Sequence, residues 1–118
     1  MNIFEDELKR LNLEDWIFII FIFVALMNIF GDQLLKKYVK RNNIKDLKDA
    51  DKIFLTTLTL TLIAYLYFVI RNYYFYKKDI KNRKLLTVKL VGSIFLVIGI
   101  LCLIYFQLKD PKFIGIPA

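Results

Sequence analysis

Three long apolar runs, at residues 16–30, 53–70 and 90–106, constrain this chain more than any other feature of its sequence. Each is close to the length of about 20 helical residues that crosses a hydrocarbon core roughly 30 Å thick. The runs are continuous and lack the alternation of transmembrane barrel strands. Since a backbone in lipid must satisfy its hydrogen bonds within the segment, the runs predict helices.

We therefore expect an all-α integral membrane protein, multi-pass in the cell membrane, with a single membrane domain over residues 1–118. The predicted transmembrane helices cover residues 16–35, 53–76 and 85–108, and an irregular tail with two prolines covers residues 109–118. Abundant Lys, Asn, Ile, Phe and Tyr are typical of AT-rich genomes and favour a bacterial source.

Residues 2–13 predict a short amphipathic helix, because Phe4, Leu8 and Leu11 fall at i, i+4 and i+7 on one face. Such a helix would lie flat in the membrane interface. The alternative is a leading extension of the first transmembrane helix. The segment begins with acidic residues and lacks a small-residue cleavage pattern, so we expect no cleavable signal peptide.

The composition excludes most enzyme classes. The chain has no histidine and one cysteine, Cys102, so it lacks a Cys/His metal site, a histidine-based triad and a haem-ligating histidine. No pair of acids, bases or nucleophiles has a spacing that specifies chemistry. We therefore expect no enzyme activity, no catalytic residue, no metal and no cofactor.

The net charge of +7 comes from Lys and Arg that lie almost entirely between the apolar runs. From there their side chains can reach anionic lipid headgroups, so the expected partner of this charge is the bilayer and not nucleic acid. Lys and Arg are nearly balanced between the two sides of a three-pass protein, so the positive-inside rule does not select an orientation. Three interpretations stay open: the first helix places the N-terminus outside and the C-terminus in the cytoplasm, the protein inserts both ways, or a partner overrides the rule.

The first candidate functional site is a polar cluster at the end of the first helix, formed by Asn28, Gly31 and Asp32. Asn28 and Asp32 share a helix face, and an ionisable residue near membrane depth is a functional hypothesis by default. The alternative is an interfacial carboxylate that pairs with Lys36 at i+4. Gly31 would then only let a neighbouring helix approach.

Small residues predict the contact between the second and third helices. Thr57, Thr61 and Ala64 form a stripe at i, i+4 and i+7, and Gly92 and Gly99 lie seven residues apart on one face. In lipid, small residues let helix backbones approach and threonines can hydrogen-bond across. The alternatives are a polar lining for an ion or solute path, and threonines that bond only their own helix.

Four charged residues at one membrane boundary predict interfacial ion pairs: Glu14 and Asp15 before the first helix, with Arg71 and Lys89 as partners. Lys89 and Asp32 differ in level by roughly 20–25 Å, so they cannot pair within one subunit.

Two hypotheses of function remain. The first is a non-enzymatic accessory or regulatory subunit that acts through helix–helix contacts, with a membrane-protein partner or by self-association. The second is a homo-oligomeric small transporter or channel, in one version with mixed orientation.

Overall fold

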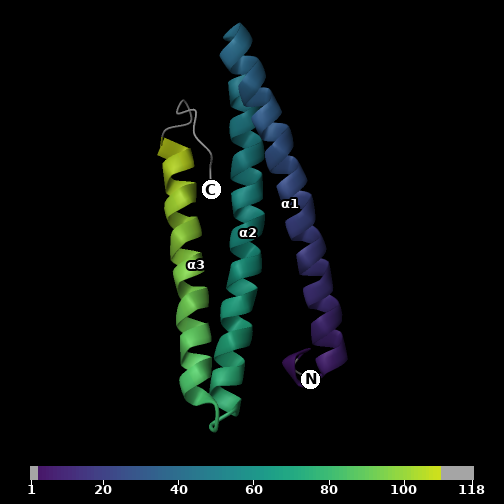
Figure 1. Ribbon diagram of the computed structural model, residues 1–118, viewed down its shortest axis with the longest axis vertical. Helices are drawn as coiled ribbons and strands as arrows, with labels where there is room; N and C mark the ends of the chain where they lie inside the picture. Colours follow the sequence, from purple (N-terminus) through teal and green to yellow (C-terminus); the bar gives the residue numbers. More distant parts are fainter. Residues whose placement is uncertain (1–2, 110–118) are drawn as a thin grey trace.

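The computed structural model describes residues 3–109, which are all-helical. Within this range, a 3-10 turn at Ile3–Glu5 precedes α1 (Glu7–Arg41), α2 (Ile44–Lys78) and α3 (Arg83–Lys109). The three helices run up, down and up beside one another (Figure 1). Each is long and apolar enough to cross a membrane. The predicted all-α class with three long apolar helices is therefore confirmed.

The N-terminal segment differs from the prediction, because no separate amphipathic helix exists among residues 3–13. Asp6 caps α1 by accepting a hydrogen bond from the Lys9 amide at 3.2 Å, and the helix then continues without a break to Arg41. No proline interrupts residues 7–41, and Gly31 alone does not end a helix, so nothing separates an interfacial segment from the first apolar run. The preceding turn places Phe4 against the rings of Tyr67 and Tyr74 on α2.

The α1–α2 junction is short because two asparagines terminate and restart the helix. Asn42 adopts the left-handed conformation with φ of 53°, which asparagine tolerates, and its amide donates to the Tyr38 carbonyl at 2.7 Å. The Asn43 side chain then accepts from the Lys45 amide at 3.0 Å and caps α2. Residues 32–91 contain no glycine or proline, so α1 and α2 extend through most of the polar connector, beyond the predicted spans 16–35 and 53–76.

The α2–α3 turn is organised by Asp79. Its carboxylate accepts hydrogen bonds from the Asn82 amide at 3.3 Å and from the Asn82 side chain at 3.0 Å. The Asn82 side chain is the main cause of the lowered pKa of the Asp79 carboxyl. The predicted third helix, residues 85–108, lies within α3, which covers Arg83–Lys109 in the structure. Beyond Lys109, the predicted irregular tail lies outside the described residues.

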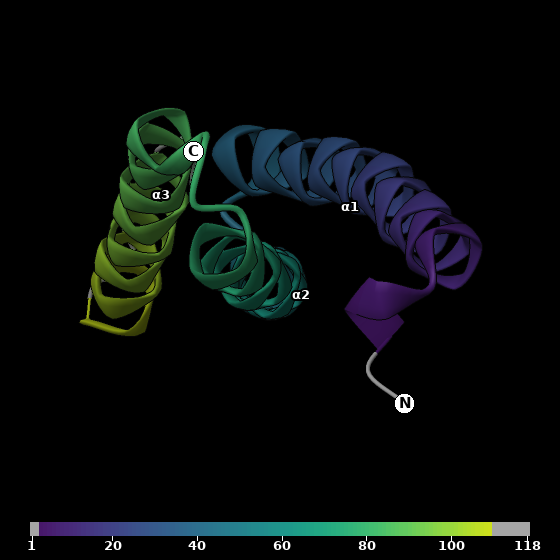
Figure 2. The same ribbon diagram turned by 90° about the horizontal axis from the view of Figure 1, so that it is seen from below.

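α2 forms the centre of the fold. Seen along the molecule, α1 and α3 lie against different sides of α2, and their contact with each other is marginal (Figure 2). Buried and half-buried positions of α1 include a stripe with alternating steps of four and three residues: 10, 14, 17, 21, 24, 28, 31, 35 and 38. α3 has the same pattern at 86, 90, 93, 97, 100, 104 and 107. This spacing averages 3.5 residues and keeps one seam on the partner helix, as in coiled coils.

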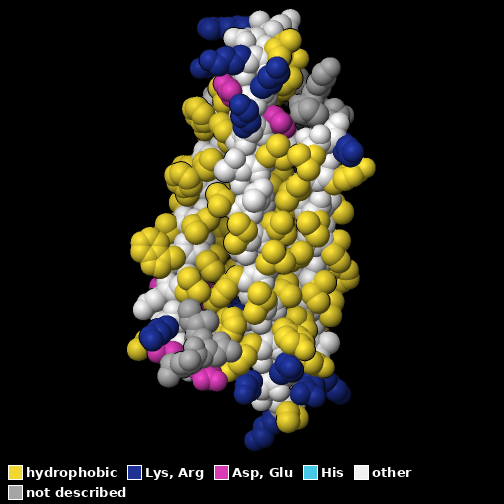
Figure 3. Space-filling model, turned by 180° about the vertical axis from the view of Figure 1, so that it is seen from behind, with side chains coloured by type: hydrophobic (Ala, Val, Ile, Leu, Met, Phe, Trp, Pro, Cys, Tyr) yellow, Lys and Arg dark blue, Asp and Glu magenta, His cyan; other side chains and the backbone are white. Residues whose placement is uncertain are grey.

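Most of the apolar surface faces outward. In the most apolar stretch of α1, α2 and α3, only 17 %, 22 % and 11 % of residues are buried. On the face shown in Figure 3, apolar side chains cover the middle of the molecule as a belt, with Lys and Arg side chains at both ends. The fold is thus a narrow body of 58 × 25 × 19 Å with little interior of its own.

Candidate functional site

Glu14 is the centre of a polar cluster between α1 and α2. The residue is 5 % exposed, and three side chains donate hydrogen bonds to its carboxylate. Arg10 Nη1 and the Tyr67 hydroxyl each lie 3.1 Å from Oε2, and Arg71 Nη1 lies 3.0 Å from Oε1. Charge-assisted hydrogen bonds of this kind are stronger than neutral ones. They explain how a carboxylate is accommodated between two helices.

The two arginines are held by aromatic rings as well as by the carboxylate. Arg10 Cζ lies 5.2 Å from the centre of the Phe75 ring, and Arg71 Cζ lies 4.8 Å from the centre of the Phe68 ring. Their side chains are 14 % and 12 % exposed. A guanidinium over an aromatic face is attracted by the ring quadrupole. The arginines are therefore held in fixed positions near the carboxylate.

Asn72 connects this cluster to α3. Its side-chain oxygen accepts from Arg71 Nε at 3.2 Å and from Arg71 Nη2 at 3.1 Å, and its amide nitrogen donates to the Lys89 carbonyl at 3.5 Å. Asn72 is 3 % exposed. Lys89 is itself exposed, and its ammonium lies within electrostatic range of Arg10, Glu14 and Arg71 without bonding any of them. All three helices thus contribute to one site, which we call the Glu14 cluster: Arg10, Glu14, Tyr67, Arg71, Asn72 and Lys89.

Of the four residues predicted to form interfacial ion pairs, two form one with each other within residues 3–109. Glu14 and Arg71 form the salt bridge that their positions beside the apolar runs suggested. Asp15 is exposed and takes part in none of the ion pairs of residues 3–109. Lys89 joins the Glu14 cluster through its backbone carbonyl, but within the same range its ammonium has no carboxylate within salt-bridge distance.

The predicted cluster at the end of the first helix is divided by the structure. The Thr57 hydroxyl donates to Asn28 Oδ1 at 2.8 Å, across the α1–α2 interface. Gly31 is buried, and a Cβ atom built there would lie 2.7 Å from Phe54 Cε1. Asp32 is half-buried and forms no ion pair with Lys36. Asn28 and Gly31 therefore belong to helix packing, and Asp32 stands apart from them.

The small residues of α2 and α3 do not meet as predicted. Thr57 faces α1 through Asn28, and the Thr61 hydroxyl donates to the Thr57 carbonyl of its own helix at 2.8 Å. Ala64 is buried. Gly92 and Gly99 are exposed, and a Cβ built at either would meet nothing within 4 Å.

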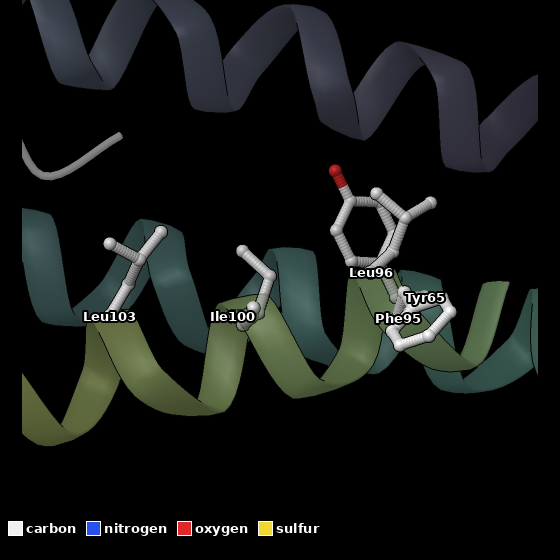
Figure 4. Close-up of a pocket in the computed structure, with 6 residues that line it drawn as sticks. Tyr65, Phe95, Leu96, Ile100 and Leu103 are labelled. Atoms are coloured by element: carbon white, nitrogen blue, oxygen red, sulfur yellow. The ribbon is translucent and has the colours of Figure 1, made fainter. Parts of the chain in front are cut away.

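Gly99 instead lines an open groove of about 370 Å³ between α2 and α3, together with Tyr65, Phe95, Leu96, Ile100 and Leu103 (Figure 4). The groove faces outward and is mostly apolar. It therefore lies along the edge of the α2–α3 seam, with Ile100 belonging to both.

A second connection between α2 and α3 lies at the opposite end of the molecule. Gln107 Nε2 donates to Asp51 Oδ1 at 2.7 Å, and Gln107 is 7 % exposed. The sequence alone did not predict this bond or the roles of Arg10, Tyr67 and Asn72. The sequence does contain one signal for the buried faces of α1 and α3. Glu14 and Asn28 are two heptads apart, as are Ser93 and Gln107.

The arrangement contains no group of three or more Asp, Glu or Cys side chains that could hold a metal ion within residues 3–109. Its chemistry is that of charge: a mostly buried carboxylate surrounded by cations, at the level where the apolar runs begin and end. Comparisons with protein-family models, curated proteins and solved structures give no significant match to this chain.

Proposed function

We propose that this chain is a multi-pass integral membrane protein that acts without an active site, as an accessory or regulatory subunit through helix–helix contacts. The observation that carries the proposal is the small buried share of each apolar helix, 11 to 22 % of its most apolar stretch. In lipid, such helices associate through packing and interhelical hydrogen bonds. Large outward faces on α1 and α3 are thus available to lipid and to helices of another protein.

Photocrosslinking from each outward face in native membranes tests this proposal. A photoreactive residue replaces Phe23 on α1 or Ile98 on α3, which are 58 % and 48 % exposed. Val24, 7 % exposed, is the matched control on α1, because it belongs to the buried stripe of that helix. We expect one discrete protein adduct from one outward face and none from the control. Lipid adducts alone from every position would contradict the proposal.

The second candidate is a homo-oligomeric small transporter or channel, and one observation favours it. Thr56 and Thr59 are exposed on α2, where they line an open groove of about 270 Å³. Their hydroxyls donate to the Lys52 and Leu55 carbonyls of their own helix, at 2.8 Å each. A polar path along this face would need a second copy of the chain to close it. Adducts between two copies, with ion flux in liposomes, would support this candidate.

Orientation belongs to the same proposal, with the N-terminus outside and the C-terminus in the cytoplasm. The residues before the first apolar run, 16–30, are acidic on balance. The residues after it include four Lys and Arg residues, at 36, 37, 40 and 41. Reporter fusions at each terminus test this orientation. Equal signals from both sides would favour insertion in both directions and the oligomeric candidate.

A further inference from the structure

The Glu14 cluster contains more positive than negative charge, and we propose that it binds the phosphate group of an anionic lipid. Arg10, Arg71 and Lys89 supply three cations, and Glu14 is the mostly buried carboxylate between them. Glu7 also approaches, 3.8 Å from Arg10 Nη2, but its side chain is 79 % exposed and held weakly. The cluster therefore keeps a surplus of at least one positive charge.

The donors of the cluster are only partly used. A guanidinium has five N–H donors and an ammonium has three. Arg10 donates one hydrogen bond to Glu14, and its second contact with a carboxylate is the distant one to Glu7. Within residues 3–109, Lys89 forms no salt bridge and its side chain has no hydrogen bond to a protein group. An oxygen-rich anion would use donors that the protein leaves open.

The position of the cluster selects the kind of anion. Glu14 precedes the apolar run 16–30, Arg71 follows the run 53–70, and Lys89 precedes the run 90–106. The site is thus at the boundary of the apolar belt, where the phosphate of a lipid lies while its acyl chains cover the helices. Basic pockets between transmembrane helices at this level bind anionic headgroups, as described for the cytoplasmic and matrix sides of membranes. Lipid phosphates lie at both boundaries of a bilayer, so with the N-terminus outside the site would meet those of the outer leaflet. This step rests on the proposed insertion in a membrane.

The three cations come from three helices, which distinguishes a site from a general basic surface. Arg10 is on α1, Arg71 on α2 and Lys89 on α3. Asn72 bonds the side chain of Arg71 and the backbone carbonyl of Lys89, so it fixes the start of α3 beside Arg71. Aromatic rings fix both arginines. A bound phosphate would therefore also connect α1 to α3, which scarcely touch each other.

Trp16, two residues after Glu14 and the single tryptophan of the chain, reports on this site. The full chain is reconstituted in phosphatidylcholine with a small share of brominated lipid, either phosphatidylglycerol or phosphatidylcholine, and tryptophan quenching gives the preference for the anionic lipid. We expect Lys89→Gln to reduce that preference about fivefold, the effect of one cation near a headgroup. Lys84→Gln removes the same charge five residues earlier on α3. Both lysines are exposed, but Lys84 has no interaction with the Glu14 cluster within residues 3–109, so its replacement should change the preference much less.

The outcomes separate this inference from the proposed function. If brominated phosphatidylcholine does not quench Trp16, the insertion itself fails. If it quenches but Lys89→Gln and Lys84→Gln have equal effects, a general basic surface explains the charge and the site is refuted. A thermal shift in detergent with inorganic phosphate, against chloride at matched ionic strength, separates a free anion from a lipid. Stabilisation by phosphate that Lys89→Gln removes would assign the same cluster to free phosphate.

Discussion

Replacing Gly31 with alanine should destabilise the α1–α2 interface, because the added methyl group has no space. A Cβ at this position would lie 2.7 Å from Phe54 Cε1 and 2.9 Å from Phe54 Cζ. Phe54 is 2 % exposed, so its ring is surrounded on all sides. Either the ring tilts or the two helices separate.

The magnitude follows from two opposing effects. Overpacking a filled interface costs about 1–3 kcal/mol, and the tip of the Phe54 ring can tilt, so we expect about 1–2 kcal/mol. The change from glycine to alanine stabilises the helix itself by up to about 1 kcal/mol, because alanine has the higher helix propensity. Gly99→Ala has the same helical benefit without the clash, since nothing lies within 4 Å of its Cβ. The free energies of unfolding of the two variants should therefore differ by about 1–2 kcal/mol.

Denaturation in mild detergent, followed by circular dichroism in the far ultraviolet, measures both variants beside the unchanged chain. The double variant Gly31→Ala, Phe54→Leu supplies the cycle that isolates the contact. We expect Phe54→Leu to cost less in the alanine background than alone, because the smaller side chain removes the clash. Equal stability of Gly31→Ala and Gly99→Ala would refute the close approach of α1 and α2 at this position.

Three further predictions concern single side chains. Thr57→Val should cost about 1 kcal/mol in the same unfolding assay, because Asn28 loses its hydrogen-bond donor in a half-buried interface. Glu14→Gln should cost about 3 kcal/mol, because two mostly buried arginines lose their carboxylate. Asn82→Ala should raise the pKa of Asp79 toward its ordinary value of 3.8 in an NMR titration of the carboxyl carbon. Since the folded pKa lies below 3.8, the turn's stabilisation is present above that pH and is lost as the pH falls through the folded pKa.

The two stability predictions, Thr57→Val and Glu14→Gln, each have a control on the same helix. Thr59→Val removes a hydroxyl that bonds only its own helix, so it should leave stability within about 0.5 kcal/mol of the original. Asp15→Asn removes an exposed carboxylate without an ion pair among residues 3–109, and the same limit applies. If the controls cost as much as the test variants, the interhelical hydrogen bonds do not determine stability. An unchanged pKa of Asp79 in Asn82→Ala would show that backbone donors alone lower it.

The type and number of the long apolar helices could be predicted from the sequence, but not their full length. Hydropathy detects where a helix is apolar and does not detect where the helix ends. The polar connector at residues 36–52 contains no glycine or proline, so α1 continues into it as far as Arg41 and α2 begins within it at Ile44. The same reasoning explains why the predicted amphipathic segment joins α1 without a boundary.

The faces of the helices were harder to predict for α3 than for α1. α3 is apolar around most of its circumference, so its sequence gives little contrast between its buried and its exposed sides. The rule that small residues mark contacts selected Gly92 and Gly99, which lie on an exposed face. In α1 the polar residues Glu14 and Asn28 are themselves part of the buried stripe, where heptad spacing indicates them.

The ion pair between Glu14 and Arg71 could be anticipated, because both residues flank apolar runs at the same level. The partners from within the helices could not. Tyr67 lies inside an apolar run, and Asn72 resembles a boundary residue, so neither stands out before the register of α1 against α2 is known. The charge surplus of the cluster appears only when three helices are placed together.

The central position of α2 has a consequence for biosynthesis. The α1–α2 pair, with its Asn28–Thr57 bond, is complete in the nascent chain before α3 has been translated. α3 then packs against the α1–α2 pair. Near the start of α3 the Lys89 carbonyl bonds Asn72, and near its end Gln107 bonds Asp51. Both steps join helices that are adjacent in sequence. A newly made chain therefore passes through a stage in which the free side of α2 is open, and a partner present at that moment would compete directly with α3.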